Sequence, residues 1–164
     1  MNMITTVKTT ILATLCTGAI TAMAAPASEW NDNWNDVLPY SRSLETVDAV
    51  VNALDGGATV NAAVDLSQCT RQDGGTPSET KGGLTVLPYR IQADGTLSFA
   101  DSHFTVSTRS GTATPIMQFL RYTVAPEGAI TVSSFIFSVP DYTLTSEVAF
   151  ECTINGGVSF HAAY

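Results

Sequence analysis

Two cysteines, Cys69 and Cys152, constrain the fold of this chain more than any other feature. The sequence has a third cysteine, Cys16, but it lies in residues 1–24, which are predicted to be a secretory signal peptide and to be removed on export. An even pair in a chain bound for an oxidising compartment predicts one structural disulfide. A reactive thiol pair is disfavoured, because the Cys-x-x-Cys spacing that lowers a thiol pKa is absent. The bridge would tie together segments far apart in the sequence.

The signal peptide is predicted from the order of its parts. Lys8 supplies the positive end, residues 11–16 open a short apolar stretch, and residues 22–24 form an Ala-Met-Ala cleavage site. A lipid anchor is not expected, because Leu15 stands before the cysteine where a lipoprotein site needs a small residue. The mature protein is therefore expected in the periplasm or outside the cell.

Charge and length narrow the class of protein. The chain has 15 acidic and 7 basic residues, a formal net charge of -8, and loss of the leader removes one of the basic residues. Nucleic acid and anionic membranes are disfavoured as partners, because both attract positive surfaces. After the leader no apolar run approaches the length that spans a bilayer. Residues 25–42 are expected to be a polar N-terminal segment, and residues 43–164 a single globular domain.

The polar segment contains a repeated triplet, Trp-Asn-Asp, that begins at Trp30 and again at Trp34. On a helical turn the two indoles would share one face and pack on the body of the protein. Exposed, they would instead form an aromatic platform for a sugar or a partner. Both interpretations stay open, so Trp30 and Trp34 are the recognition candidates of the sequence.

One amphipathic helix is predicted after this segment. Ser43 is the expected N-cap, and Asp-Gly-Gly at residues 55–57 ends the helix, because glycine accepts the left-handed backbone found there. The apolar residues recur at helical spacing. They are Leu44, Val47, Val50, Val51 and Leu54.

The rest of the chain alternates strand-like segments with turns. The expected strands span residues 60–66, 84–91, 96–99, 104–108, 116–124, 129–139, 144–154 and 158–163. Residues 70–83 are expected to be a surface loop, and Asn155-Gly156 to join the last two strands in a locally paired hairpin. The predicted fold class is α+β, mainly β. One N-terminal helix packs on a curved antiparallel sheet or open barrel of about six to eight strands, tied by the disulfide.

Catalytic patterns are few. The sequence lacks zinc spacing, a Gly-x-Ser-x-Gly elbow and a glycine loop that opens a helix, so no catalytic, metal or cofactor residue is assigned. Asp101 and His103 are two residues apart, so on a strand they share a face. With a nearby hydroxyl they would suit a small secreted hydrolase. Binding is easier to motivate, because curved sheets often enclose an apolar cavity for one small ligand.

The helix and first strand together carry a family resemblance. Residues 50–57, ending in Leu-Asp-Gly-Gly, and residues 60–69, ending in Asp-Leu-Ser-Gln-Cys, look like the opening of VirK-family proteins, and Phe150-x-Cys152 resembles the second cysteine strand of that family. The resemblance spans about residues 40–164 and is carried by short motifs that suit folding. It implies a small exported protein, associated in some bacteria with virulence or host contact, with no established activity and no catalytic residues to carry over.

The sequence therefore predicts an exported, non-enzymatic accessory protein that binds a small apolar ligand or a protein partner. Two alternatives stay open. One is the hydrolase that uses Asp101 and His103. The other is an inhibitor of an extracellular enzyme, with residues 70–83 as the inserted loop.

Overall fold

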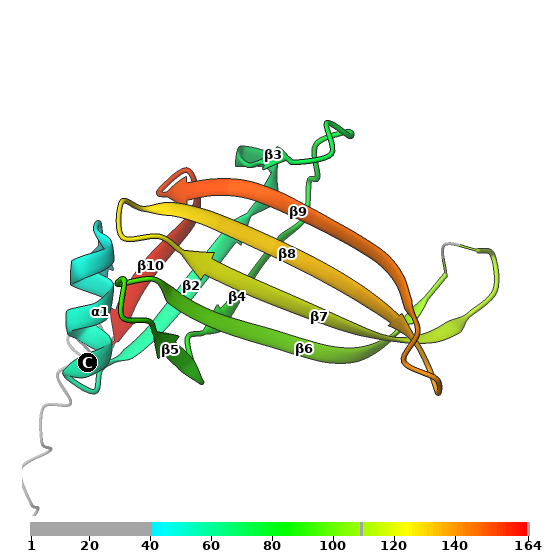
Figure 1. The fold of residues 1–164 in the computed structure, drawn as a ribbon, viewed down its shortest axis with the longest axis horizontal. Helices are drawn as coiled ribbons and strands as arrows, with labels where there is room; N and C mark the ends of the chain where they lie inside the picture. The colour runs from blue at the N-terminus through cyan, green and yellow to red at the C-terminus, as the bar shows by residue number, and fades with distance from the viewer. Residues whose placement is uncertain (1–40, 109, 164) are drawn as a thin grey trace, which may run out of the picture. The chain divides into compact units, whose positions relative to one another are not determined.

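The computed structural model describes residues 41–108 and 110–163. Within these ranges the chain forms one α-helix, a short 3-10 helix and ten strands, most of which Figure 1 labels. In chain order they are β1 (Ser41–Leu44), α1 (Val47–Asp55), β2 (Thr59–Asp65), η2 (Leu66–Gln68), β3 (Thr70–Arg71), β4 (Lys81–Thr85), β5 (Tyr89–Ile91), β6 (Leu97–Ser107), β7 (Thr114–Val124), β8 (Ala129–Ser138), β9 (Leu144–Ile154) and β10 (Gly157–Ala163).

The strands form one curled, mainly antiparallel sheet. Its order is β4-β2-β10-β9-β8-β7-β6-β5, with β1 added beside β10 and β3 beside β9. Figure 1 shows the long strands β6 to β9 running side by side, with β10, β2 and β4 crossing behind them and α1 at one end. The predicted class, a curved and mainly antiparallel sheet with one helix, is confirmed.

The core lies inside the curl, near α1. Alternation along each strand sends every second side chain inward, because successive side chains of a strand point to opposite faces. Leu97, Ile130 and Phe160 are each 0% exposed. The helix closes this end by burying Val47, Val50, Ala53 and Leu54 on one side.

A disulfide joins Cys69, which follows η2, to Cys152 on β9. Both residues are buried, with 6% and 5% of their surface exposed. Gly157 packs directly against the bridge: a Cβ on this residue would collide with the Cys69 sulfur, and its φ of 107° lies where glycine is favoured. The predicted disulfide is therefore present, and the first residue of β10 is fitted to it.

The helix begins later than predicted. Ser43, the expected N-cap, lies in β1, where it pairs with His161 of β10. The N-cap is Thr46, whose hydroxyl accepts a hydrogen bond from the Ala49 amide at 3.2 Å. The helix was predicted to start too early because Leu44 fits the helical spacing of apolar residues. Leu44 is indeed buried, but as the last residue of strand β1.

The last two strands do not form the expected local hairpin. A turn occurs at Asn155, whose φ is 60°, but β10 then meets β9 over two residue pairs only, and in parallel. From Val158 to Ala163, β10 instead pairs antiparallel with β2. The positive φ values at Asn155 and Gly157 turn the chain across the curl, so β10 leaves its sequence neighbour.

The segment between β3 and β5 also differs from the prediction. Lys81, Gly82 and Gly83 lie in β4 and pair with β2, so the expected loop over residues 70–83 is shorter. The single strand expected over residues 84–91 is divided in two, and Pro88, which has no amide hydrogen to donate, lies in the break.

None of the helices in the described ranges has the length and apolar character needed to cross a membrane.

Candidate functional site

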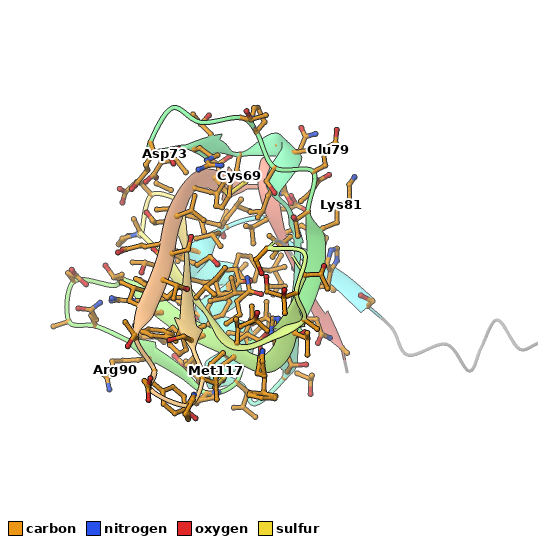
Figure 2. All side chains as sticks on the ribbon, turned by 90° about the vertical axis from the view of Figure 1, so that its right-hand side faces the viewer. Cys69, Asp73, Glu79, Lys81, Arg90 and Met117 are labelled. Carbon is orange, nitrogen blue, oxygen red and sulfur yellow. A yellow bond between two sulfur atoms is a disulfide. The ribbon has the colours of Figure 1, made fainter. Side chains whose placement is uncertain are left out.

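A cavity of about 390 Å³ lies inside the curl, beyond the core as seen from α1. Its walls are the inner faces of β6, β7, β8 and β9 on one side and the first residues of β4 on the other. Figure 2 looks into the curl from the end opposite α1, with Lys81 on one side of the ring of strands and Cys69 above.

The inner face of β6 to β9 is ordered by polarity. The strand registers place inward residues in rows that run across the four strands. The two rows nearer α1, called here the apolar rows, are Leu97-Val124-Ile130-Cys152 and Phe99-Tyr122-Val132-Phe150. The next two, called the polar rows, are Asp101-Leu120-Ser134-Val148 and His103-Gln118-Ile136-Ser146. The cavity is lined by both polar rows and by three members of the second apolar row.

Tyr122 places a hydroxyl at the boundary between the two sets of rows. The residue is 4% exposed, and its ring stacks on Phe99 with centroids 4.8 Å apart. Burial, and then the negative charge of Asp101, raises the pKa of Tyr122 to about 12. Within the described ranges its hydroxyl has no hydrogen-bond partner, so a protonated, unpaired donor lines the cavity.

Asp101 and His103 lie on one face of β6, and both line the cavity. The two strands expected over residues 96–99 and 104–108 are one continuous strand, so the segment between them, which holds this pair, is not the predicted break. Nδ1 of His103 is 3.7 Å from Oδ2 of Asp101, and about half of each side chain is exposed. Among the described residues no serine or threonine hydroxyl forms a hydrogen bond with His103. A hydrolase would need that contact for a nucleophile, so the structure supplies the Asp-His pair without the third group.

Gln118 and Ser134 fix a polar contact in the wall. Nε2 of Gln118 donates to Oγ of Ser134 at 3.2 Å, across β7 and β8. Ser134 is 7% exposed and is the one buried polar residue of the described ranges. The carbonyl oxygen of the Gln118 amide stays free to accept a hydrogen bond from within the cavity.

Lys81 stands at the rim with its charge already paired. Its Nζ lies 2.7 Å from Oδ2 of Asp65, on the neighbouring strand β2. That hydrogen bond, followed by one from the Ser67 hydroxyl, holds the pKa of Asp65 below its ordinary value. The pair is solvent-exposed, and it leaves Asp101 as the unneutralised carboxylate of the cavity lining.

Gly82 is one of several cavity residues, with Gln118 and Ser134, that the sequence did not indicate. It pairs with Val64, a buried residue of β2, and therefore faces inward. A Cβ on Gly82 would meet nothing within 4 Å, and its backbone does not have a positive φ. The sequence placed Gly82 and Gly83 in a loop, because two glycines weaken any strand prediction.

The aromatic residues of the sheet are divided between its faces. Phe99, Tyr122, Phe150 and Phe160 are buried inside the curl. Phe119 and Phe135 contact each other on the outer face, with ring centroids 6.3 Å apart. Farther from α1, the large exposed apolar residues include Phe104, Val106, Tyr142 and Leu144.

A serine-histidine contact lies away from the cavity. Oγ of Ser159 is 3.2 Å from Nε2 of His161, two residues along β10. The Ser-x-His spacing on a strand was the signal that could have indicated it. No carboxylate contacts this pair in the described ranges, and they hold no group of three or more histidine, cysteine or acidic residues that could bind a metal ion.

Trp30, Trp34 and the predicted signal peptide over residues 1–24 lie outside the described residues. The hypotheses attached to them stay as the sequence left them.

Comparisons with known proteins give a consistent picture. A family model described as VirK protein matches residues 43–142. The uncharacterized protein y4wH of Sinorhizobium fredii is 41% identical over 126 residues, which cover 75% of this chain and 84% of that protein. An uncharacterized protein encoded in the pinF2 3′ region of Rhizobium radiobacter is 41% identical over 122 residues, covering 73% and 82%.

A solved structure shares the fold. The crystal structure of a VirK family protein from Legionella pneumophila superposes with a TM-score of 0.64 at 18% identity, covering 72% of this chain and 97% of that one. At this identity the likeness concerns the fold alone.

Proposed function

The chain belongs to the VirK family, and from that premise we propose that it is an exported binding protein that holds one small amphiphilic molecule in the cavity of its curled sheet. The observation that carries the proposal is the cavity itself. Its volume of about 390 Å³ lies within the range of small-molecule sites, and a few polar groups converge in it above an apolar floor.

The gradient of polarity suggests how such a molecule would lie. An apolar portion would rest against the second apolar row, where Val132 and Phe150 are 1% and 4% exposed. A polar head would lie in the polar rows, within reach of Asp101 and Gln118. Because the apolar rows bury hydrocarbon and the polar rows supply hydrogen-bond partners, the site favours molecules with both parts.

Export to the periplasm or beyond is part of the proposal. It is supported by the predicted leader over residues 1–24 and by the disulfide between Cys69 and Cys152, since structural disulfides persist in oxidising compartments. The association with host contact that the family resemblance implies is proposed with it. Cell fractionation followed by mass spectrometry tests export: recovery of the chain in the cytoplasm with residues 1–24 still attached would contradict it.

A binding role is preferred to hydrolysis because of what contacts His103. Among the described residues His103 is paired with Asp101, whereas the hydroxyl of Ser134, in the cavity wall, accepts a hydrogen bond from Gln118. A ligand needs no nucleophile, whereas a hydrolase needs one in contact with its base.

The test of the proposal fills the cavity from Gly82. In Gly82→Leu the new side chain would point into open space beside Val64 without backbone strain, so the fold should persist while the cavity shrinks. Ala63→Leu is the matched control, because Ala63 is exposed on the opposite face of β2. Binding is followed by the fluorescence of N-phenylnaphthylamine, an uncharged probe that emits in apolar surroundings.

The wild-type chain and Ala63→Leu are expected to bind the probe alike, and Gly82→Leu to bind it at least about tenfold more weakly, as expected when a side chain occupies the ligand's volume. Far-ultraviolet circular dichroism verifies that each variant is folded. Equal binding by all three proteins, or no binding by the wild type, would reject the cavity as the site.

A further inference from the structure

We infer that the cavity selects amphiphiles with a cationic amine head over those with a carboxylate or a hydroxyl head. The inference rests on the proposed function, since it names the ligand class of the same site. It is carried by the charges and the hydrogen-bonding groups that line the polar rows.

The cavity presents one free negative charge. The described lining contains one lysine, Lys81, and no arginine. The ammonium of Lys81 is paired with the Asp65 carboxylate, 2.7 Å away. The carboxylate of Asp101 accepts no hydrogen bond in the described ranges, and Nδ1 of His103 lies 3.7 Å from its Oδ2. A carboxylate head would therefore meet repulsion from Asp101, with no unpaired lysine or arginine to offset it.

The uncharged groups also suit a donor head. The free carbonyl of Gln118 accepts hydrogen bonds, the Tyr122 hydroxyl can both donate and accept, and both residues belong to the same cavity lining as Asp101. An ammonium carries three donors and no acceptor, so it can contact Asp101 and one of these oxygens at once. A hydroxyl head carries one donor and no charge, so it gains less from the carboxylate.

The buried position of Tyr122 makes this arrangement a built site. The residue is 4% exposed, its ring is held by stacking on Phe99, and its hydroxyl has no partner in the described part of the chain. No buried side-chain polar atom of the described residues lacks a partner, so the Tyr122 hydroxyl is accessible from the cavity, where a ligand can pair with it.

The experiment compares three ligands of equal chain length. Octylamine, octanol and octanoate compete with N-phenylnaphthylamine for the full chain at about pH 8, where histidine is ordinarily neutral. Asp101→Asn removes the carboxylate and keeps its shape. Glu147→Gln is the matched control, because it removes one charge from an exposed outer-face position of β9.

We expect octylamine to displace the probe best, and Asp101→Asn to weaken octylamine about tenfold while leaving octanol unchanged, because a charge-assisted hydrogen bond is lost. Glu147→Gln should leave the order intact. Equal affinity for octylamine and octanol, or equal effects of the two substitutions, would overturn the inference while probe binding still supports the cavity. Failure of the probe to bind the wild type would remove the proposed function and the inference together.

Discussion

Removal of the disulfide should cost this protein a large part of its stability. The bridge joins residues 83 positions apart, and the chain-entropy relation gives about 4 to 5 kcal/mol for a loop of that length. Domains of this size have about 5 to 15 kcal/mol in total. The double substitution Cys69→Ala and Cys152→Ala is the suitable perturbation, because serine would place polar hydroxyls at two buried positions.

Guanidinium unfolding of the wild type and the double variant, followed by circular dichroism, measures the effect. The free energy of unfolding should fall by about 4 kcal/mol, and the dependence on denaturant should steepen, because the uncrosslinked chain exposes more surface. Reductant should reproduce the loss in the wild type and change nothing in the double variant. A loss below about 1 kcal/mol would refute the argument from loop closure.

Gly157 extends this test to packing. Gly157→Ala places a Cβ against the Cys69 sulfur at a positive φ, whereas Gly128→Ala has a similar φ of 93° with nothing within 4 Å. Both share the backbone penalty, so the difference between them reports the collision. In the double variant Cys69→Ala and Cys152→Ala, the extra loss of unfolding free energy caused by Gly157→Ala should fall by about 1 kcal/mol or more. An unchanged loss would show that the disulfide is not the reason for a glycine at this position.

Two further predictions concern single side chains. Because the pKa of Tyr122 is raised to about 12, its contribution to stability is complete below about pH 10 and is lost as the pH rises toward about 12. Urea unfolding at about pH 9 and about pH 11 should therefore show a steeper loss in the wild type than in Tyr122→Phe, and parallel losses would contradict the burial argument. Thr46→Ala should lower the free energy of unfolding by about 1 kcal/mol through loss of the N-cap, and Ser43→Ala should lower it much less, as measured by thermal unfolding. Equal losses would contradict the assignment of Thr46 as the N-cap.

The predictable parts of the fold were those set by local pattern. The two-residue spacing of Asp101 and His103 predicted a shared face, because the period of a strand needs no knowledge of its neighbours, although the strands were expected on either side of this pair. The pair of Cys69 and Cys152 followed from export and parity alone.

The parts that escaped prediction depend on distant partners. β1 is a strand because β10, more than a hundred residues later, pairs with it, and no local signal in residues 41–44 separates it from the helix. The turn at Asn155 was predicted correctly, but the positive φ values at Asn155 and Gly157 direct β10 to pair with β2, and this partner could not be predicted from the local sequence. Gly82 was assigned to a loop because glycine has no side chain and so adds nothing to an alternating pattern of polar and apolar residues.

The most direct test of the cavity is where a bound probe lies. Nuclear Overhauser effects between N-phenylnaphthylamine and the full chain report the side chains that contact it. We expect contacts to the methyl groups of Val132 and Val148, which line the inner face. Contacts confined to the outer-face pair Phe119 and Phe135, with the methyl groups inside the curl unaffected, would contradict this expectation.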